Sequence, residues 1–230
     1  MGNLSRRLKR IFCSVATAGS FTLGGCVSPG GLQGRPLTRG ETEMARSVFG
    51  DTVDYSKVHV YNGPPKVAGI FRLTKTGLAA ITPNGDIYIV EKDAQLGDLS
   101  QASPEKRKML IHEMTHVWQH QHGVNVEADG VFLFFKSSMN YDKAYAYDIN
   151  GKQKFRQLNI EQQAHMVEDY FALRDMPEWE APPDRAEKIA KFEAMLKPAL
   201  PLSADGGRSA PPPSPPAKSP PAQSPPPPSA

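Results

Sequence analysis

The chain has 230 residues and a formal net charge of +3 at pH 7, with 27 Lys and Arg, 24 Asp and Glu, and two cysteines. Both cysteines, Cys13 and Cys26, lie near the N-terminus. The rest of the chain has no cysteine, which excludes disulfides, cysteine nucleophiles and cysteine-based zinc sites there. Residues 1–25 hold four of the basic residues and no acid, and without them the net charge is −1. Nothing in this balance indicates a nucleic-acid partner, and we expect none.

The start of the chain has the features of an export signal in their usual order. Basic residues at positions 6–10 precede a mostly apolar stretch over residues 11–23, which Gly24, Gly25 and Cys26 follow. This pattern is typical of a bacterial lipoprotein that is cleaved before a lipidated cysteine. The apolar stretch is too short for a membrane span, although an ordinary secretory signal or an uncleaved anchor is the alternative.

This interpretation divides the N-terminal region and predicts a location. We expect residues 1–25 to be a lipoprotein signal peptide, Cys26 to carry the lipid, and residues 26–40 to be a tether. Val27 follows the cysteine where an aspartate would favour the inner membrane, and this resembles the sorting signal of outer-membrane lipoproteins. The expected location is the periplasmic face of the outer membrane, with the membrane as a partner through the lipid anchor.

Three short segments upstream of residue 91 predict a small antiparallel sheet. Residues 58–61 read as one strand, and residues 78–82 and 86–90 read as a hairpin with Asn84-Gly85 in its turn.

Residues 103–121 predict a helix. Ser103 is a typical N-cap, Pro104 suits the first helical position, and Gly123 supplies the stop. Apolar residues at helical spacing, Leu110, Met114, Val117 and Trp118, predict one buried face.

This helix carries the motif His112-Glu113-Met114-Thr115-His116, an H-E-x-x-H sequence. Residues four apart share a helix face, so both imidazoles reach one metal ion while Glu113 lies close enough to accept a proton from a bound water. The motif therefore predicts a zinc site, with His112 and His116 as ligands and Glu113 as general base.

A catalytic zinc site needs a third protein ligand, and the histidines at the end of the helix are one set of candidates. His122 falls six residues after His116, where metzincins place a histidine, but Gln119 replaces the glycine that breaks the metzincin helix. On a continuous helix His122 points away from the first two ligands. His120 faces better but lies two turns from His112.

The other candidates lie on a second predicted helix, residues 159–171. Asn159 and Gln162 resemble a capping pair at its start. Its polar flank holds three potential ligands at helical spacing, namely Glu161, His165 and Glu168.

Two segments resemble known zinc peptidases. A zinc helix followed by a helix that donates a glutamate resembles the gluzincins, such as the thermolysin-like peptidases. More narrowly, residues 112–119, H-E-M-T-H-V-W-Q, and residues 161–171, E-Q-Q-A-H-M-V-E-D-Y-F, resemble small bacterial predicted zinc peptidases related to Vgr proteins. The resemblance covers roughly residues 75–175.

This resemblance implies that Glu161 is the third zinc ligand, with Glu168 as the alternative. Gluzincins commonly place an aspartate one turn after the ligand glutamate, where it orients the first histidine, and His165 stands at that position here. Glu168 or Asp169 is then the expected substitute.

The remaining segments complete the predicted organisation. Residues 131–135 are an apolar run, and Tyr141, Tyr145 and Tyr147 suggest a loop or hairpin between the two zinc helices. Residues 184–197 predict an amphipathic helix with Asp184 as its N-cap. The Pro-rich residues 203–230 predict a disordered tail.

The predicted fold class is α+β, a single domain over residues 41–202 with a small antiparallel sheet before a zincin-type helix pair. The predicted function is Zn²⁺-dependent hydrolysis of a peptide or protein substrate by an exported lipoprotein. Two alternatives are a non-catalytic lipoprotein module stabilised by a metal ion, and a cell-wall amidase. A fourth protein ligand would favour the non-catalytic module, because structural zinc sites close their coordination sphere.

Overall fold

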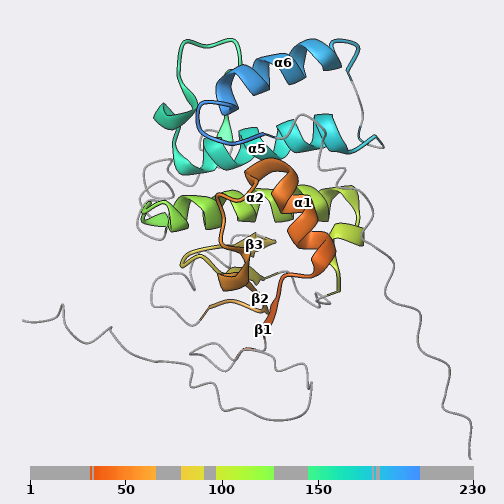
Figure 1. Ribbon diagram of the computed structural model, residues 1–230, viewed down its shortest axis with the longest axis vertical. Helices are drawn as coiled ribbons and strands as arrows, with labels where there is room; N and C mark the ends of the chain where they lie inside the picture. Colours follow the sequence, from red (N-terminus) through yellow and green to blue (C-terminus); the bar gives the residue numbers. More distant parts are fainter. Residues whose placement is uncertain are drawn as a thin grey trace, which may run out of the picture.

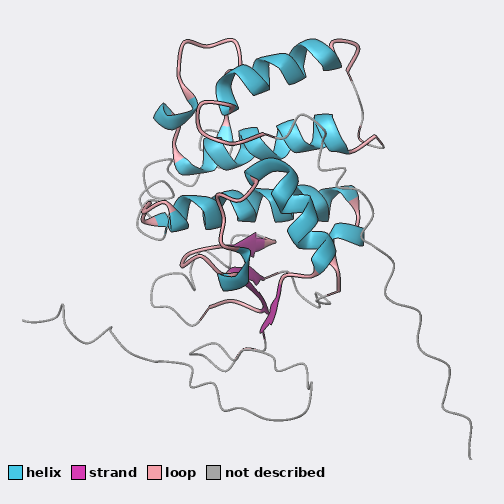
Figure 2. Cartoon of the chain, in the orientation of Figure 1, coloured by secondary structure: helices cyan, strands magenta, loops and turns pink. Residues whose placement is uncertain are grey.

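A four-stranded sheet lies at one end of the molecule, and helices α2, α5 and α6 are stacked above it in that order, with α1 crossing α2 (Figures 1 and 2). The computed structural model describes residues 32, 34–65, 79–90, 97–126, 145–177, 179 and 182–202. The strands are β1 (Gly34–Pro36), β2 (His59–Asn62), β3 (Ala80–Ile81) and β4 (Ile87–Ile89). The helices are α1 (Arg39–Phe49), α2 (Pro104–Gln121), α5 (Ile160–Asp175) and α6 (Arg185–Leu196), with short 3₁₀ turns at Tyr55–Lys57, Leu99–Gln101 and Phe155–Gln157.

The sheet confirms the α+β prediction but is mixed, with the strand order β1-β2-β4-β3. The hairpin is confirmed: β3 and β4 are antiparallel, with Ala80 opposite Ile89, and Gly85 has the positive φ that its turn requires. The expectation of a wholly antiparallel sheet is wrong for one pair, because β2 and β4 run parallel, with Val60 opposite Ile87. A parallel pair needs a connection of about a dozen residues or more, and 24 residues (63–86) separate β2 from β4 in the sequence.

The two long helices begin where the sequence predicts, and α2 also ends there, whereas α5 continues to Asp175, four residues beyond the predicted end. In α2, Pro104 occupies the first turn, and Gly123 follows the last turn with a φ of 86°. In α5, Asn159 and Gln162 form a capping box, in which each side chain accepts a hydrogen bond from the other residue's backbone N–H. The buried faces of these helices meet, and α5 packs between α2 and α6.

One strand and one helix were not predicted. β1 lies within residues 26–40, which the sequence suggested to be a tether, and α1 starts there too. A capping box of Thr38 and Glu41 opens α1, and this T-x-x-E pattern was the signal available in the sequence. Residues 34–40, which the sequence assigned to the tether, are therefore part of the folded domain.

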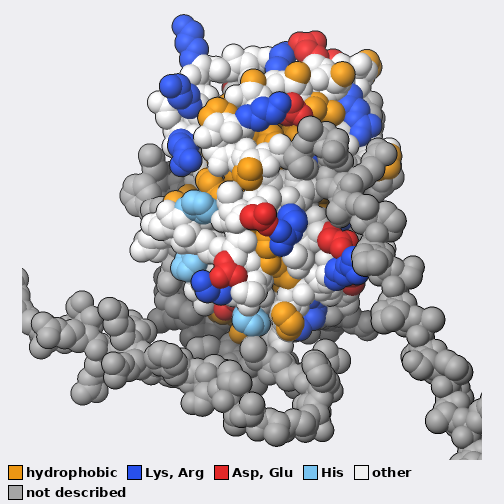
Figure 3. All heavy atoms as spheres, in the orientation of Figure 1, with side chains coloured by type: hydrophobic (Ala, Val, Ile, Leu, Met, Phe, Trp, Pro, Cys, Tyr) orange, Lys and Arg blue, Asp and Glu red, His pale blue; other side chains and the backbone are white. Residues whose placement is uncertain are grey.

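Several predicted features lie outside the described residues. They are the signal peptide of residues 1–25, Cys26, the apolar run at 131–135, Tyr141 and the tail after residue 202. Within the described ranges, no helix is both long and apolar enough to cross a membrane. On the face shown in Figure 3, basic and acidic side chains are interspersed.

Candidate metal centre

Three predicted ligands converge between α2 and α5. The Nε2 atoms of His112 and His116 are 3.3 Å apart, and Oε2 of Glu161 lies 3.3 Å from the first and 3.4 Å from the second. The two histidines face α5 because they are one turn apart on α2, and Glu161 faces them from the first turn of α5.

The size and the chemistry of this triangle fit a divalent metal ion. The point at its centre lies about 2 Å from all three atoms, which is the usual length of zinc–nitrogen and zinc–oxygen bonds. Two imidazoles and a carboxylate are also the ligand set of many catalytic zinc sites. Among the described His, Cys, Asp and Glu side chains, no fourth ligand atom joins these three.

Hydrogen bonds orient both imidazoles. Nδ1 of His112 lies 3.1 Å from Oε2 of Glu168, and Nδ1 of His116 lies 2.8 Å from Oε1 of Gln119. Both acceptors are oxygen atoms, so each Nδ1 carries the proton and each Nε2 lone pair is available to a metal ion. The alternative in which Glu168 is the third ligand is not supported, because Glu168 lies on the opposite nitrogen of His112.

Gln119 is a functional candidate that the sequence did not reveal. The sequence showed only that it stands where the metzincin motif has a glycine. Its side chain is fully buried, and its Nε2 donates hydrogen bonds to the carbonyl of Ile160 and to Oε1 of Gln163. One amide therefore joins the ring of His116 to the first turn of α5, which carries Glu161. Its position three residues after His116 on the same helix was the available signal.

Glu113, the predicted general base, is 4% exposed. Its Oε2 accepts a hydrogen bond of 2.6 Å from the hydroxyl of Thr82, which follows β3. Burial raises the pKa of Glu113, although His112 and His116 oppose the shift. The sequence placed Thr82 only in a strand, and no local pattern linked it to Glu113.

The electrostatics of the site favour a bound cation. Burial opposes a charge on His112, but hydrogen bonds to Glu161 and Glu168 outweigh it and hold the pKa of His112 well above its usual value. Burial likewise disfavours the Glu161 carboxylate, but the two histidines hold the pKa of Glu161 well below its usual range. The carboxylates that favour a proton on the histidines also favour a metal ion between them.

A second group of potential ligands, formed by His165, Glu168 and Asp169, adjoins the triangle through the contact of Glu168 with His112. Its oxygen atoms already have partners. Lys108 Nζ lies 2.9 Å from Asp169 and 3.5 Å from Glu168, and the hydroxyl of Tyr147 donates to Asp169 at 2.6 Å. This group therefore supports the partner of His112, and Lys108, one turn before His112 on α2, neutralises it.

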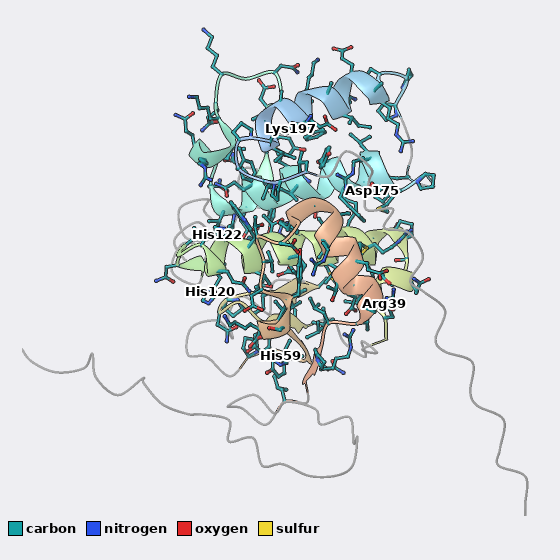
Figure 4. The ribbon with its side chains drawn as sticks, viewed as in Figure 1. Arg39, His59, His120, His122, Asp175 and Lys197 are labelled. Atoms are coloured by element: carbon teal, nitrogen blue, oxygen red, sulfur yellow. The ribbon has the colours of Figure 1, made fainter. Side chains whose placement is uncertain are left out.

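The other histidine candidates lie elsewhere. His120 and His122 are at the C-terminal end of α2 (Figure 4), where His120 contacts the hairpin turn at Gly85 and His122 donates from Nδ1 to the carbonyl of Trp118. Nδ1 of His165 donates to the carbonyl of Tyr145, and the ring of Tyr145 is 5.9 Å from that of His112. None of the three histidines joins the His112, His116 and Glu161 triangle.

Comparison with known proteins identifies relatives. No protein-family model matches the chain. The chain is 37% identical over 163 residues to the type VI secretion system spike protein VgrG2b of Pseudomonas aeruginosa, a match that covers 68% of this chain and 14% of VgrG2b. It thus spans a small part of that protein's length. The solved structure of the effector domain of P. aeruginosa VgrG2b is 33% identical, with a TM-score of 0.54, and the match covers 72% of this chain and 83% of that domain.

Proposed function

The chain belongs to the family of the VgrG2b effector domain, and from this kinship and the geometry of the site we propose that it is a zinc metallopeptidase. The observation that carries the proposal is the triangle of His112, His116 and Glu161, whose three ligand atoms lie within 3.4 Å of one another next to a buried glutamate. Three protein ligands favour a catalytic site, since a structural zinc site usually has four.

The residues of the site support hydrolysis by an activated water. When bound, zinc supplies Lewis acidity to the water and to the scissile carbonyl. His112, His116 and Glu161 would hold the ion, and Glu113 would take the proton from the attacking water and pass it to the leaving amine. Glu168 and Gln119 keep the two imidazoles in the tautomer that binds a metal.

The position of the sheet supports an extended peptide as substrate. Among the described strands, β3 lies at the edge of the sheet; it packs against α2 and ends next to Thr82, the partner of Glu113. An edge strand offers unpaired backbone groups to a peptide in extended conformation. A peptide aligned along β3 would pass the metal centre.

The decisive experiment compares the wild-type protein with Glu113→Gln. We expect both to bind about one zinc ion per chain, by elemental analysis, and only the wild type to cleave a mixed peptide library. Loss of zinc in Glu113→Gln would contradict the assigned role, because Glu113 is not a ligand. Cleavage of peptidoglycan but not of peptides would support an amidase, and zinc binding without hydrolysis would support a non-catalytic module.

We also propose that the protein is exported as a lipoprotein, anchored through Cys26 to the periplasmic face of the outer membrane. The support is the order of the basic, apolar and Gly-Gly-Cys segments over residues 6–26. A fatty-acid probe should label the wild type in the membrane fraction, and Cys26→Ser should abolish the label. Unlabelled wild-type protein in the cytoplasm would refute this proposal.

A further inference from the structure

We propose that Thr82 is a positioning residue for Glu113, holding one carboxylate oxygen so that the other faces the water to be activated. The inference rests on the proposed peptidase function. It adds a residue that directly follows a strand to a site whose ligands and base all lie on helices. It also ties the general base to the strand along which a peptide would bind.

The contact is short and buried on both sides. The hydroxyl of Thr82 lies 2.6 Å from Oε2 of Glu113, and the two residues are 3% and 4% exposed. A buried carboxylate needs donors to offset its lost hydration, and each donor also restricts its orientation. Because Oε2 is engaged by Thr82, we infer that proton transfer falls to Oε1.

The place of Thr82 in the fold explains why this contact matters for catalysis. Thr82 directly follows β3 and precedes the hairpin turn, whose Gly85 lies against His120 of α2. The turn is thus held against α2 as well. The base and the edge strand therefore keep one relative position, and a peptide paired with β3 meets Glu113 in a constant geometry. A misplacement of about 1 Å at a catalytic group can lower the rate by about a hundredfold.

The activity test uses two substitutions of Thr82. Thr82→Val keeps the shape but removes the donor, so we expect kcat to fall by about tenfold to a hundredfold while KM changes less than about twofold and zinc is retained. Thr82→Ser restores the donor and should recover most of the rate. Thr42→Val, which removes a hydroxyl on α1 that donates to the carbonyl of Thr38, is the matched control. A Thr82→Val enzyme with the kcat of the wild type would overturn the inference.

A second measurement does not depend on activity. In urea unfolding, Thr82→Val should lower the midpoint in the wild-type background but much less in a Glu113→Leu background, where no carboxylate is left without its partner. Equal shifts of the urea midpoint in both backgrounds would show that the Thr82–Glu113 hydrogen bond does not contribute to stability, and would contradict the inference. If the wild type cleaves peptides but the effects of Thr82→Val and Glu113→Leu on stability are independent, only this inference is contradicted. If the wild type binds zinc but cleaves no peptide, the proposed function and the positioning role are both overturned.

Discussion

At the residue scale, the two histidines of the candidate metal centre differ in what orients them. His112 donates to the carboxylate of Glu168, whereas His116 donates to the neutral amide of Gln119. A carboxylate partner strengthens the donor ability of a ligating imidazole more than an amide does, because it stabilises positive charge on the ring. The carboxylate that contacts His112 is that of Glu168, seven residues after Glu161 and one of the two substitutes that the sequence led us to expect.

We expect Glu168→Ala to lower zinc affinity by about tenfold to a hundredfold without removing a ligand. Glu168→Gln should be milder, because its amide oxygen still accepts from Nδ1 of His112. Competition titration with a chelator measures both. Glu161→Ala should show a larger loss, and His122→Ala, at the end of α2, should show none. A greater loss from His122→Ala than from Glu161→Ala would return the third ligand to the metzincin position.

At the element scale, the N-terminus of α5 decides where Glu161 points. Glu161 is the second residue of the helix and lies between the two residues of its capping box, Asn159 and Gln162. The amide of Gln119 binds the carbonyl of Ile160 in the same turn. A first turn that frays would move Glu161 away from the histidines, so cap and ligand are coupled.

Asn159→Ala should therefore reduce both stability and metal affinity. Loss of the cap is expected to cost about 1 kcal/mol of unfolding free energy, measured in urea, and to weaken zinc binding by severalfold. Asp184→Ala at the start of α6 is a matched control, because Asp184 makes no side-chain cap hydrogen bond, and it should cost less than about 0.5 kcal/mol. Equal effects of the two substitutions on zinc affinity would show that the cap does not position Glu161.

At the scale of the whole molecule, one buried carboxylate joins β1, α1 and the segment before α2. Glu41 has no exposed surface, and its oxygen atoms accept from Arg35 at 2.7 and 2.8 Å and from the backbone N–H groups of Thr38 and Leu99. Arg35 also donates to the carbonyl of Gly97. The strand β1 is thereby held against the segment that leads into α2.

Arg35→Ala leaves this carboxylate buried without its charged partner, so we expect a loss of about 2 kcal/mol or more in unfolding free energy. Arg39, labelled in Figure 4, forms an exposed pair with Glu43. Arg39→Ala removes this pair and should lower the unfolding free energy by less than about 1 kcal/mol. Urea unfolding of the full chain compares the two. Similar losses for both variants would mean that Glu41 does not join these elements.

Local physics made much of this architecture predictable from the sequence. Caps, helix stops and hairpin turns depend on neighbours within four residues, so α2, α5, α6 and the β3–β4 hairpin were all expected. The i, i+4 spacing likewise placed His112 and His116 on one face of α2. β1 and α1 were missed, although the capping pattern of Thr38 and Glu41 marks the start of α1.

Only the tertiary structure decided the contacts between distant residues. Glu161 and Glu168 share a flank of one helix, and the rotation of α5 against α2 sets which of them meets Nε2 and which meets Nδ1 of His112. The parallel pairing of β2 with β4 and the contact of Thr82 with Glu113 depend in the same way on how the sheet packs against α2. The sequence alone determined which residues were available for the site, because helix and turn formation are local. The packing of the helices and the sheet determined their partners, because it sums many weak contacts that no short pattern records.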